Sequence, residues 1–168
     1  MATIRVRSNG FGYGTKNNDK IYGDGKDNDI YGYGGNDRIY GAAGDDYLEG
    51  NNGRDTLTGG AGSDSFYFGH LNPMPEIDVI TDYSNKYDAI LLANDVFRGI
   101  GSAEKWMKAS AFWQGTKAHD TSDRIIYNSK DGLIYYDPDG TGSKEATPFV
   151  KVGAGRKMSA TDFWVVDY

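Results

Sequence analysis

Residues 14–67 read GTKNNDKIY, GDGKDNDIY, GYGGNDRIY, GAAGDDYLE, GNNGRDTLT and GGAGSDSFY, six consecutive units of nine residues. Every unit begins with Gly, four of the six have Gly again at position 4, and all carry Asp or Asn at position 6. Position 8 is always apolar and holds, in order, Ile21, Ile30, Ile39, Leu48, Leu57 and Phe66. One apolar side chain per unit, within polar surroundings, predicts one short strand per unit with a single buried face.

The period of the pattern predicts how the units are arranged. The first six residues of each unit are typical of a turn, so turn, strand, turn and strand complete one coil in eighteen residues. Alternate units then stack, and six units give three coils, roughly 14 Å of stacking at ~4.8 Å per strand. Residues 5–13 (RVRSNGFGY) look like a decayed unit that caps the open end. The predicted fold class is all-β, beginning as a parallel β-roll.

Stacking also brings the acidic residues of position 6 together. The rows would place carboxylates about 5 Å apart on each edge of the roll, where they repel one another unless a counter-ion is bound. Carboxylate and carbonyl oxygens, without Cys or clustered His, favour Ca²⁺ over transition metals. The sequence predicts four sites shared between alternate units and a fifth where the last coil meets the following segment. The alternative is an Asx-turn ladder, in which the same acids only cap turns.

The predicted ligands are the position-6 side chains together with positions 1, 3 and 4 of units three to six, where glycine lets the backbone approach an ion. They are Asp19, Asn28, Gly32, Gly34, Gly35, Asp37, Gly41, Ala43, Gly44, Asp46, Gly50, Asn52, Gly53, Asp55, Gly59, Ala61, Gly62 and Asp64. Units one and two depart from the pattern, because they have Asn17 and Lys26 at position 4 and the uncharged Asn28 at position 6. Sites built on these two units are expected to be the weakest.

Four further motifs follow in order along the chain: GGAGSDSFYF (59–68), DVITDYSNKYDAI (78–90), DRIIYNSKDGLIYYDPDGTG (123–142) and SATDFWVV (159–166). The nonapeptides match the calcium-binding pattern of RTX proteins. Together with these motifs, residues 14–168 resemble the C-terminal region of serralysin-type secreted metalloproteases, over about nine-tenths of the chain.

This resemblance implies a division into a β-roll at residues 1–69 and a β-sandwich-like region at 70–168. It adds Asp82 and Asp88 to the predicted calcium ligands. It also implies a secreted, extracellular protein that is exported by a type I secretion apparatus through an uncleaved C-terminal signal, here matched by residues 162–166 (DFWVV). The chain is expected to be the tail of a larger secreted protein.

Patterning in the second half predicts five more strands and one helix. Residues 77–80 and 90–92 are expected to be strands that continue the stack. Residues 102–114 (SAEKWMKASAFWQ) predict one short helix, capped by Ser102. Residues 124–127 and 133–136 flank a turn and predict a β-hairpin. Residues 149–152 are expected to form a last strand. The acidic stretch 137–142 (DPDGTG) lacks the spacing of an EF-hand loop and is interpreted as a turn.

Composition limits the functions that remain. The net charge is −6, and residues 14–67 hold ten acids against five bases, so five of the six excess charges lie in the repeats, which argues against nucleic acid as a partner. There is no Cys, no run of transmembrane length, and no H-E-x-x-H, G-x-S-x-G or P-loop motif, so the chain is not expected to be an enzyme.

A second hypothesis is a module that binds extracellular polysaccharide or a cell surface, with calcium only structural. Tyr22 and Tyr40, at position 9 of alternate units, would be neighbours on one outer face. They could stack on sugars or simply pack across strands.

Overall fold

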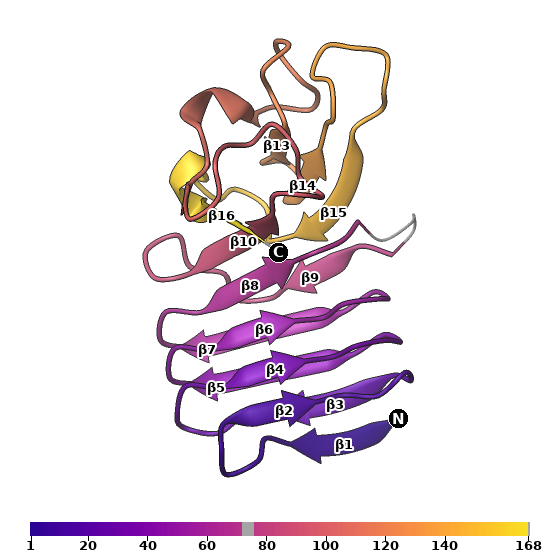
Figure 1. The fold of residues 1–168 in the computed structure, drawn as a ribbon, viewed down its shortest axis with the longest axis vertical. Coiled ribbons are helices and arrows are strands. Elements are labelled where there is room, and N and C mark those ends of the chain that lie inside the picture. The colour runs from indigo at the N-terminus through magenta and orange to yellow at the C-terminus, as the bar shows by residue number, and fades with distance from the viewer. Residues whose placement is uncertain (72–75, 168) are drawn as a thin grey trace.

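The computed structural model describes residues 1–71 and 76–167, and nearly all of its regular structure is β (Figure 1). Residue 168, the last residue of the expected second region, lies outside the described residues. Within the described part of the chain, no helix is long and apolar enough to cross a membrane.

The first ten strands build the roll as stacked coils (Figure 1). They are β1 (Ala2–Arg5), β2 (Phe11–Tyr13), β3 (Asp19–Tyr22), β4 (Asp29–Tyr31), β5 (Arg38–Ala43), β6 (Tyr47–Glu49), β7 (Thr56–Ala61), β8 (Ser65–Phe68), β9 (Asp78–Ile80) and β10 (Ala89–Ala93). Odd-numbered strands pair in parallel in one sheet and even-numbered strands in the other. Ile21 pairs with Ile39 and Ile30 with Leu48, which confirms the coil of eighteen residues.

The roll is longer than the six units. Residues 2–13 supply β1 and β2 and so add a coil at the N-terminal end, while β9 and β10 add another at the opposite end. The expectation that residues 77–80 and 90–92 continue the stack is therefore confirmed.

The position-8 side chains fill the space between the two sheets. All six are fully buried and belong to one hydrophobic cluster that continues into the C-terminal part. Burial of these aliphatic and aromatic groups is the main favourable contribution that the roll makes to its own stability.

Both sheets continue past residue 70. β15 (Thr147–Lys151) joins β9, and β14 (Leu133–Tyr136), β13 (Ile125–Asn128) and β12 (Phe112–Gln114) follow it, giving nine strands. In the other sheet β16 (Phe163–Val166) joins β10, and β11 (Lys105–Trp106) closes the edge, giving seven strands. The hairpin of β13 and β14 is antiparallel as predicted, and β15 contains most of the predicted last strand.

The helix predicted over residues 102–114 is wrong. The segment forms β11, a single turn of 3₁₀ helix (Ala109–Ala111) and β12. Gly101 and Glu104 have positive φ angles, which an α-helix does not allow. Trp106 pairs with Trp164 across the antiparallel β11–β16 contact, so pairing at a sheet edge outweighs the helical periodicity.

Candidate metal centre

The position-6 side chains lie buried along the two edges of the roll, each no more than 2 % exposed. In four of them Oδ1 accepts a hydrogen bond from the backbone N–H of position 6 in the preceding coil. On one edge the N–H of Asp19 donates to Asp37 (2.7 Å) and that of Asp37 to Asp55 (2.7 Å). On the other edge the N–H of Asn28 donates to Asp46 (2.9 Å) and that of Asp46 to Asp64 (3.1 Å). One oxygen of each of these four carboxylates therefore serves the structural ladder that was the alternative to a metal site.

The other oxygen distinguishes the two interpretations. Oδ2 of Asp37, Asp46 and Asp55 is buried and has no hydrogen-bond partner among residues 1–71 and 76–167. A buried acceptor without a partner costs stability, more so when it is charged. Burial accordingly raises the pKa of each of these three carboxyls to about 7. These oxygens are unsatisfied by the protein and fit a bound cation.

Backbone oxygens converge on the same places. A Cβ added at Gly32 would lie 2.6 Å from Oδ2 of Asp37 and 2.6 Å from the carbonyl oxygen of Gly50. A Cβ added at Gly41 would lie 2.5 Å from the carbonyl oxygen of Gly59 and would overlap Oδ2 of Asp46. Position 1 must be glycine because any side chain would displace these oxygens. An all-oxygen donor set from adjacent coils suits Ca²⁺.

Units one and two satisfy their own side chains. Oδ2 of Asp19 accepts hydrogen bonds from the Thr15 backbone N–H (2.9 Å) and hydroxyl (2.7 Å). Burial acts to raise the pKa of Asp19, but the hydrogen bonds from Thr15 and Ala2 outweigh it and lower that pKa. In unit two, Oδ1 of Asn28 accepts from the Asp24 N–H (2.8 Å). Here the ladder interpretation describes the turns better, which agrees with the expectation of weak sites.

Backbone conformation divides the units in the same way. Units three to six have positive φ at positions 2 and 4, in Tyr33, Ala42, Asn51, Gly60, Gly35, Gly44, Gly53 and Gly62. The residues at these positions in units one and two do not have positive φ, although Asn17 could have adopted it. Four units therefore share one turn conformation, and the first two do not.

The C-terminal end of each ladder is closed by a residue outside the repeats. Oδ1 of Asp88 accepts the Asp64 N–H (3.1 Å), and the two oxygens of Asp82 accept the N–H groups of Gly59 (3.0 Å) and Gly60 (2.9 Å). The structure thus brings Asp82 and Asp88 to the turn of unit six, the last turn on the edge of the roll formed by units two, four and six.

On the opposite edge, formed by units one, three and five, Asp78 accepts the last hydrogen bond of the ladder. The sequence did not predict this residue as part of the site. Its Oδ1 accepts the Asp55 N–H (2.8 Å), and burial raises its pKa to about 8. It follows Asp55 by 23 residues rather than 18, so the repeat period does not point to it. The acid at the start of the DVITDY motif was the available signal.

A second ladder, at position 5, was also missed. Oδ1 of Asn18 accepts the Asn36 N–H (2.7 Å), and Oδ1 of Asp27 accepts the Asp45 N–H (2.8 Å). These side chains are exposed and bond to the following coil, opposite in direction to the buried ladder. The small amide or acid at position 5 of the first four units was the available signal.

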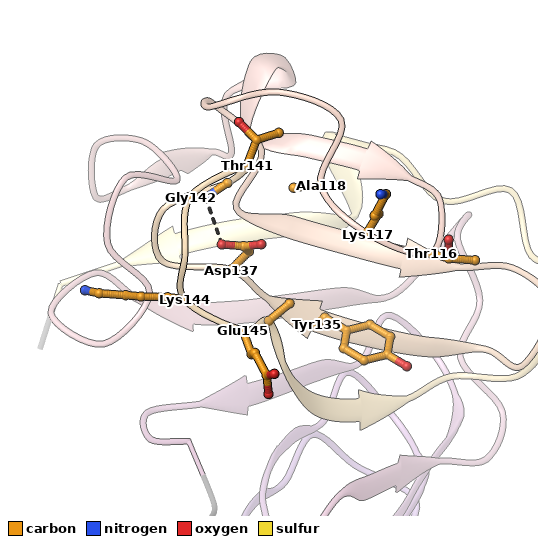
Figure 2. Close-up of a pocket in the computed structure, with 11 residues that line it drawn as sticks. Thr116, Lys117, Ala118, Tyr135, Asp137, Thr141, Gly142, Lys144 and Glu145 are labelled. Carbon is orange, nitrogen blue, oxygen red and sulfur yellow. Dashed lines mark hydrogen bonds between the residues drawn. The ribbon is translucent and has the colours of Figure 1, made fainter.

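One cavity lies away from the repeats, beside β14 and the 137–146 loop (Figure 2). It measures about 500 Å³ and is lined by Lys117, Lys144 and Glu145 among others. Oδ1 of Asp137 accepts the N–H groups of Asp139 (3.1 Å) and Gly140 (2.8 Å), as in an ordinary acidic turn. These contacts support the interpretation of residues 137–142 as a turn.

Comparison with known proteins agrees with the geometry of the repeats. Residues 13–48 and 40–69 match the sequence model of the RTX calcium-binding nonapeptide repeat. The repeats therefore bind Ca²⁺, and the chain contains an RTX β-roll. No curated protein sequence matches the chain significantly.

Among solved structures, the fold is similar to the solution structure of the AlgE6R3 subunit from the Azotobacter vinelandii mannuronan C5-epimerase. The TM-score is 0.50 with 24 % identity, over 83 % of this chain and 71 % of that one. This likeness establishes a shared fold.

Proposed function

We propose that this chain is the calcium-triggered folding and export module of a larger secreted protein. The observation that carries the proposal is the unpartnered, buried Oδ2 on Asp37, Asp46 and Asp55. A roll that buries three unsatisfied carboxylate oxygens is poorly stable alone and gains stability from any cation they bind. We assign this non-catalytic module no reaction.

Calcium supplies the positive charge that these turns lack. The residues at positions 1, 3, 4 and 6 of units three to six, together with Asp82 and Asp88, would hold the ions, and Asp19 and Asn28 would contribute weakly. Sites of extracellular modules have dissociation constants on the order of 10⁻⁴–10⁻³ M. Such sites stay empty in the cytosol and fill outside the cell. Because an unfolded chain has no preformed site, binding free energy becomes folding free energy.

Export of an unfolded chain is compatible with folding that begins only when calcium binds outside the cell. The signal-like residues 162–166 form the end of a 3₁₀ turn and β16, and Phe163 and Val165 are fully buried between the sheets. A secretion apparatus could read these side chains only before the chain folds. The serralysin-type resemblance of the four C-terminal motifs supports this part of the proposal.

Circular dichroism of the chain with and without calcium tests the proposal. In chelator the β signal of residues 14–67 should be lost, and millimolar calcium should restore it cooperatively. A chelated chain whose spectrum is unchanged would contradict calcium-triggered folding. Export is tested separately, by fusing the chain to a reporter and deleting residues 162–166, which should abolish secretion through a type I channel.

The second candidate function is binding of extracellular polysaccharide or a cell surface. The fold neighbour belongs to a mannuronan C5-epimerase, and this chain exposes several aromatic rings on its outer faces. Tyr22 and Tyr40 are stacked on each other, with centroids 4.9 Å apart and planes at 7°, so this pair is better explained as cross-strand packing. Retention of the calcium-loaded chain on immobilised polysaccharide tests this function.

A further inference from the structure

The outer face of the seven-stranded sheet carries a continuous row of large side chains. Strand pairing aligns Tyr13 with Tyr31 and aligns Leu91 with both Tyr67 and Trp164. Beyond these, Trp106 faces Trp164 across the last strand pair. We call this row the aromatic stripe; it comprises Tyr13, Tyr31, Tyr33, Tyr47, Tyr67, Trp164 and Trp106. It extends over the width of the seven strands, roughly 29 Å at ~4.8 Å per strand, and is interrupted on β10, where Leu91 lies between Tyr67 and Trp164.

The rings of the stripe are spaced more widely than those of the opposite face. Centroids are 5.6 Å apart for Tyr13 and Tyr31, 5.7 Å for Tyr31 and Tyr47, and 5.8 Å for Tyr47 and Tyr67. Two rings in full face-to-face contact would be only about 3.5–4.0 Å apart, so these rings are offset. Tyr33 and Trp106 are each 49 % exposed, and Tyr13 is 37 % exposed. Tyr67, by contrast, is only 6 % exposed, so it is the partly exposed rings towards the two ends of the stripe that offer aromatic surface to a ligand.

Two adjoining grooves follow the stripe. One, of about 290 Å³, is lined by Tyr13, Tyr31, Tyr33, Glu49 and Asn51. The next, of about 330 Å³, is lined by Tyr31, Tyr47, Glu49, Tyr67 and Leu91 among others. Because Tyr31 and Glu49 line both, the grooves form one track along the roll.

The polar groups in the track suit a ligand with hydroxyl groups. Oε2 of Glu49 accepts the Tyr47 hydroxyl proton (3.4 Å), and Asn51 hydrogen-bonds to Glu49. Flat aromatic surface beside a few fixed acceptors and donors is the composition of a small-molecule site, and tyrosine provides rigid amphipathic contact area.

The charged side chains along the track favour an uncharged ligand over a negatively charged one. Glu49 lines both grooves and Asp167 lines the end of one. Arg7, above the ring of Tyr13, is placed at the far end. An acidic track in a chain of net charge −6 disfavours a polyanion.

We infer that the aromatic stripe binds an uncharged, extended polysaccharide of β-1,4-linked hexopyranose units. In such a chain successive sugar rings are spaced roughly like adjacent strands, so the chain could follow the track while its sugars contact the exposed rings of Tyr13 and Tyr33. The inference rests on the second function proposed above and adds to it the face that binds and the class of sugar.

The test uses the calcium-loaded full chain with two probes, amorphous cellulose as the uncharged β-1,4-glucan and alginate as the polyanion. Tyr13→Ala/Tyr33→Ala removes two exposed rings from the stripe. Tyr22→Ala/Tyr40→Ala removes two rings from the opposite sheet and is the matched control. Circular dichroism in calcium first establishes that both variants are folded.

We expect the wild-type chain and the control to bind cellulose, with affinity at least tenfold weaker in the stripe variant and little dependence on salt. Binding to alginate alone, or loss of binding only in the control, would overturn the inference and leave polysaccharide binding as the function. Retention on neither probe, nor on a wider set of immobilised polysaccharides, would overturn both.

Discussion

At the scale of single residues, the partner of one carboxylate oxygen separates the two kinds of turn. Thr15 donates two hydrogen bonds to Oδ2 of Asp19, whereas Oδ2 of Asp55 has no partner in the part of the chain that the structure describes. The nonapeptide pattern predicted both acids as ligands. It could not predict which of them the protein itself satisfies, because that depends on the side chain at position 2 and on the backbone of the turn.

Asp55→Asn should separate the two roles of this side chain. The amide still offers an oxygen to the Asp37 N–H but removes the buried negative charge. We expect calcium affinity to fall by roughly tenfold or more, because ligand charge sets affinity in such sites. Without calcium the variant should be no less stable than the wild type. Calcium titration by calorimetry, together with urea unfolding in chelator, measures both effects.

Asp27→Asn is the control for this variant. It makes the same change of charge at an exposed position-5 side chain, which also accepts a backbone N–H through Oδ1. It should leave calcium affinity nearly unchanged. An equal loss in both variants would point to general electrostatics rather than to the buried oxygen of Asp55.

The calcium-free chain should become less stable as pH rises. Burial raises the pKa of Asp37, Asp46 and Asp55 to about 7, above the ordinary value of about 3.9 for an unfolded Asp. Between these values the folded state binds more protons than the unfolded state, so the free energy of unfolding decreases with pH. It levels off only above about pH 8, because burial raises the pKa of Asp78 to about 8.

Thermal melting in chelator from about pH 4 to about pH 8 measures this slope. A melting temperature that rises with pH over this range would contradict the burial of these carboxyls. With calcium present the trend should reverse, because protons then compete with the ion for the same oxygens.

At the scale of elements, much of the fold follows from periodicity. One apolar residue every nine positions predicted the strands and the coil of eighteen residues, because only position 8 faces the core. The same reasoning failed for residues 102–114. Trp106 and Trp113 have helical spacing, but both are exposed on strands at sheet edges, and no local signal showed that β16 would offer an edge there.

Gly53→Ala should destabilise the turn of unit five. Gly53 has φ +122°, and a Cβ there would overlap the carbonyl oxygen of Gly35 in the neighbouring coil. The strain should cost roughly 1–3 kcal/mol. Chemical unfolding in saturating calcium measures this loss.

Gly25→Ala provides the comparison within the same repeats. Gly25 has no positive φ, and a Cβ there would have no heavy atom within 4 Å. The substitution should be neutral or slightly stabilising, since it restricts the unfolded chain. Equal losses in both variants would contradict the distinction between the turns of units two and five.

At the scale of the whole molecule, the buried ladder has a direction. Each carboxylate accepts the N–H of the preceding coil, so every coil is completed by the coil that follows it. The last repeats are completed by Asp78 and Asp88, which lie after the repeats, in the last coil of the roll that β9 and β10 form where it joins the C-terminal part. The weak sites expected in units one and two are one reason for order to grow from the C-terminal coils. The hydrogen bonds of the ladder supply a separate reason.

Truncation from the two ends should therefore have unequal effects. A chain of residues 1–69 lacks Asp78, Asp88 and the strands that cover the last coil, so the N–H groups of Asp55 and Asp64 lose their acceptors. We expect it to remain unfolded at calcium concentrations that fold the full chain. A chain of residues 14–168 loses β1, β2 and their hydrogen bonds to the first two repeats, but it keeps every acceptor of the buried ladder in units three to six. It should fold with nearly unchanged calcium dependence.

Circular dichroism against calcium concentration compares the two truncations. Hydrogen exchange of the full chain adds the order of events. Near the calcium midpoint, amides of β6, β8 and β10 should be protected before those of β2 and β4, because the former lie nearest the C-terminal part. Equal protection along the roll, or a folded chain of residues 1–69, would mean that calcium alone closes each coil and that the C-terminal part is not needed to start the stack.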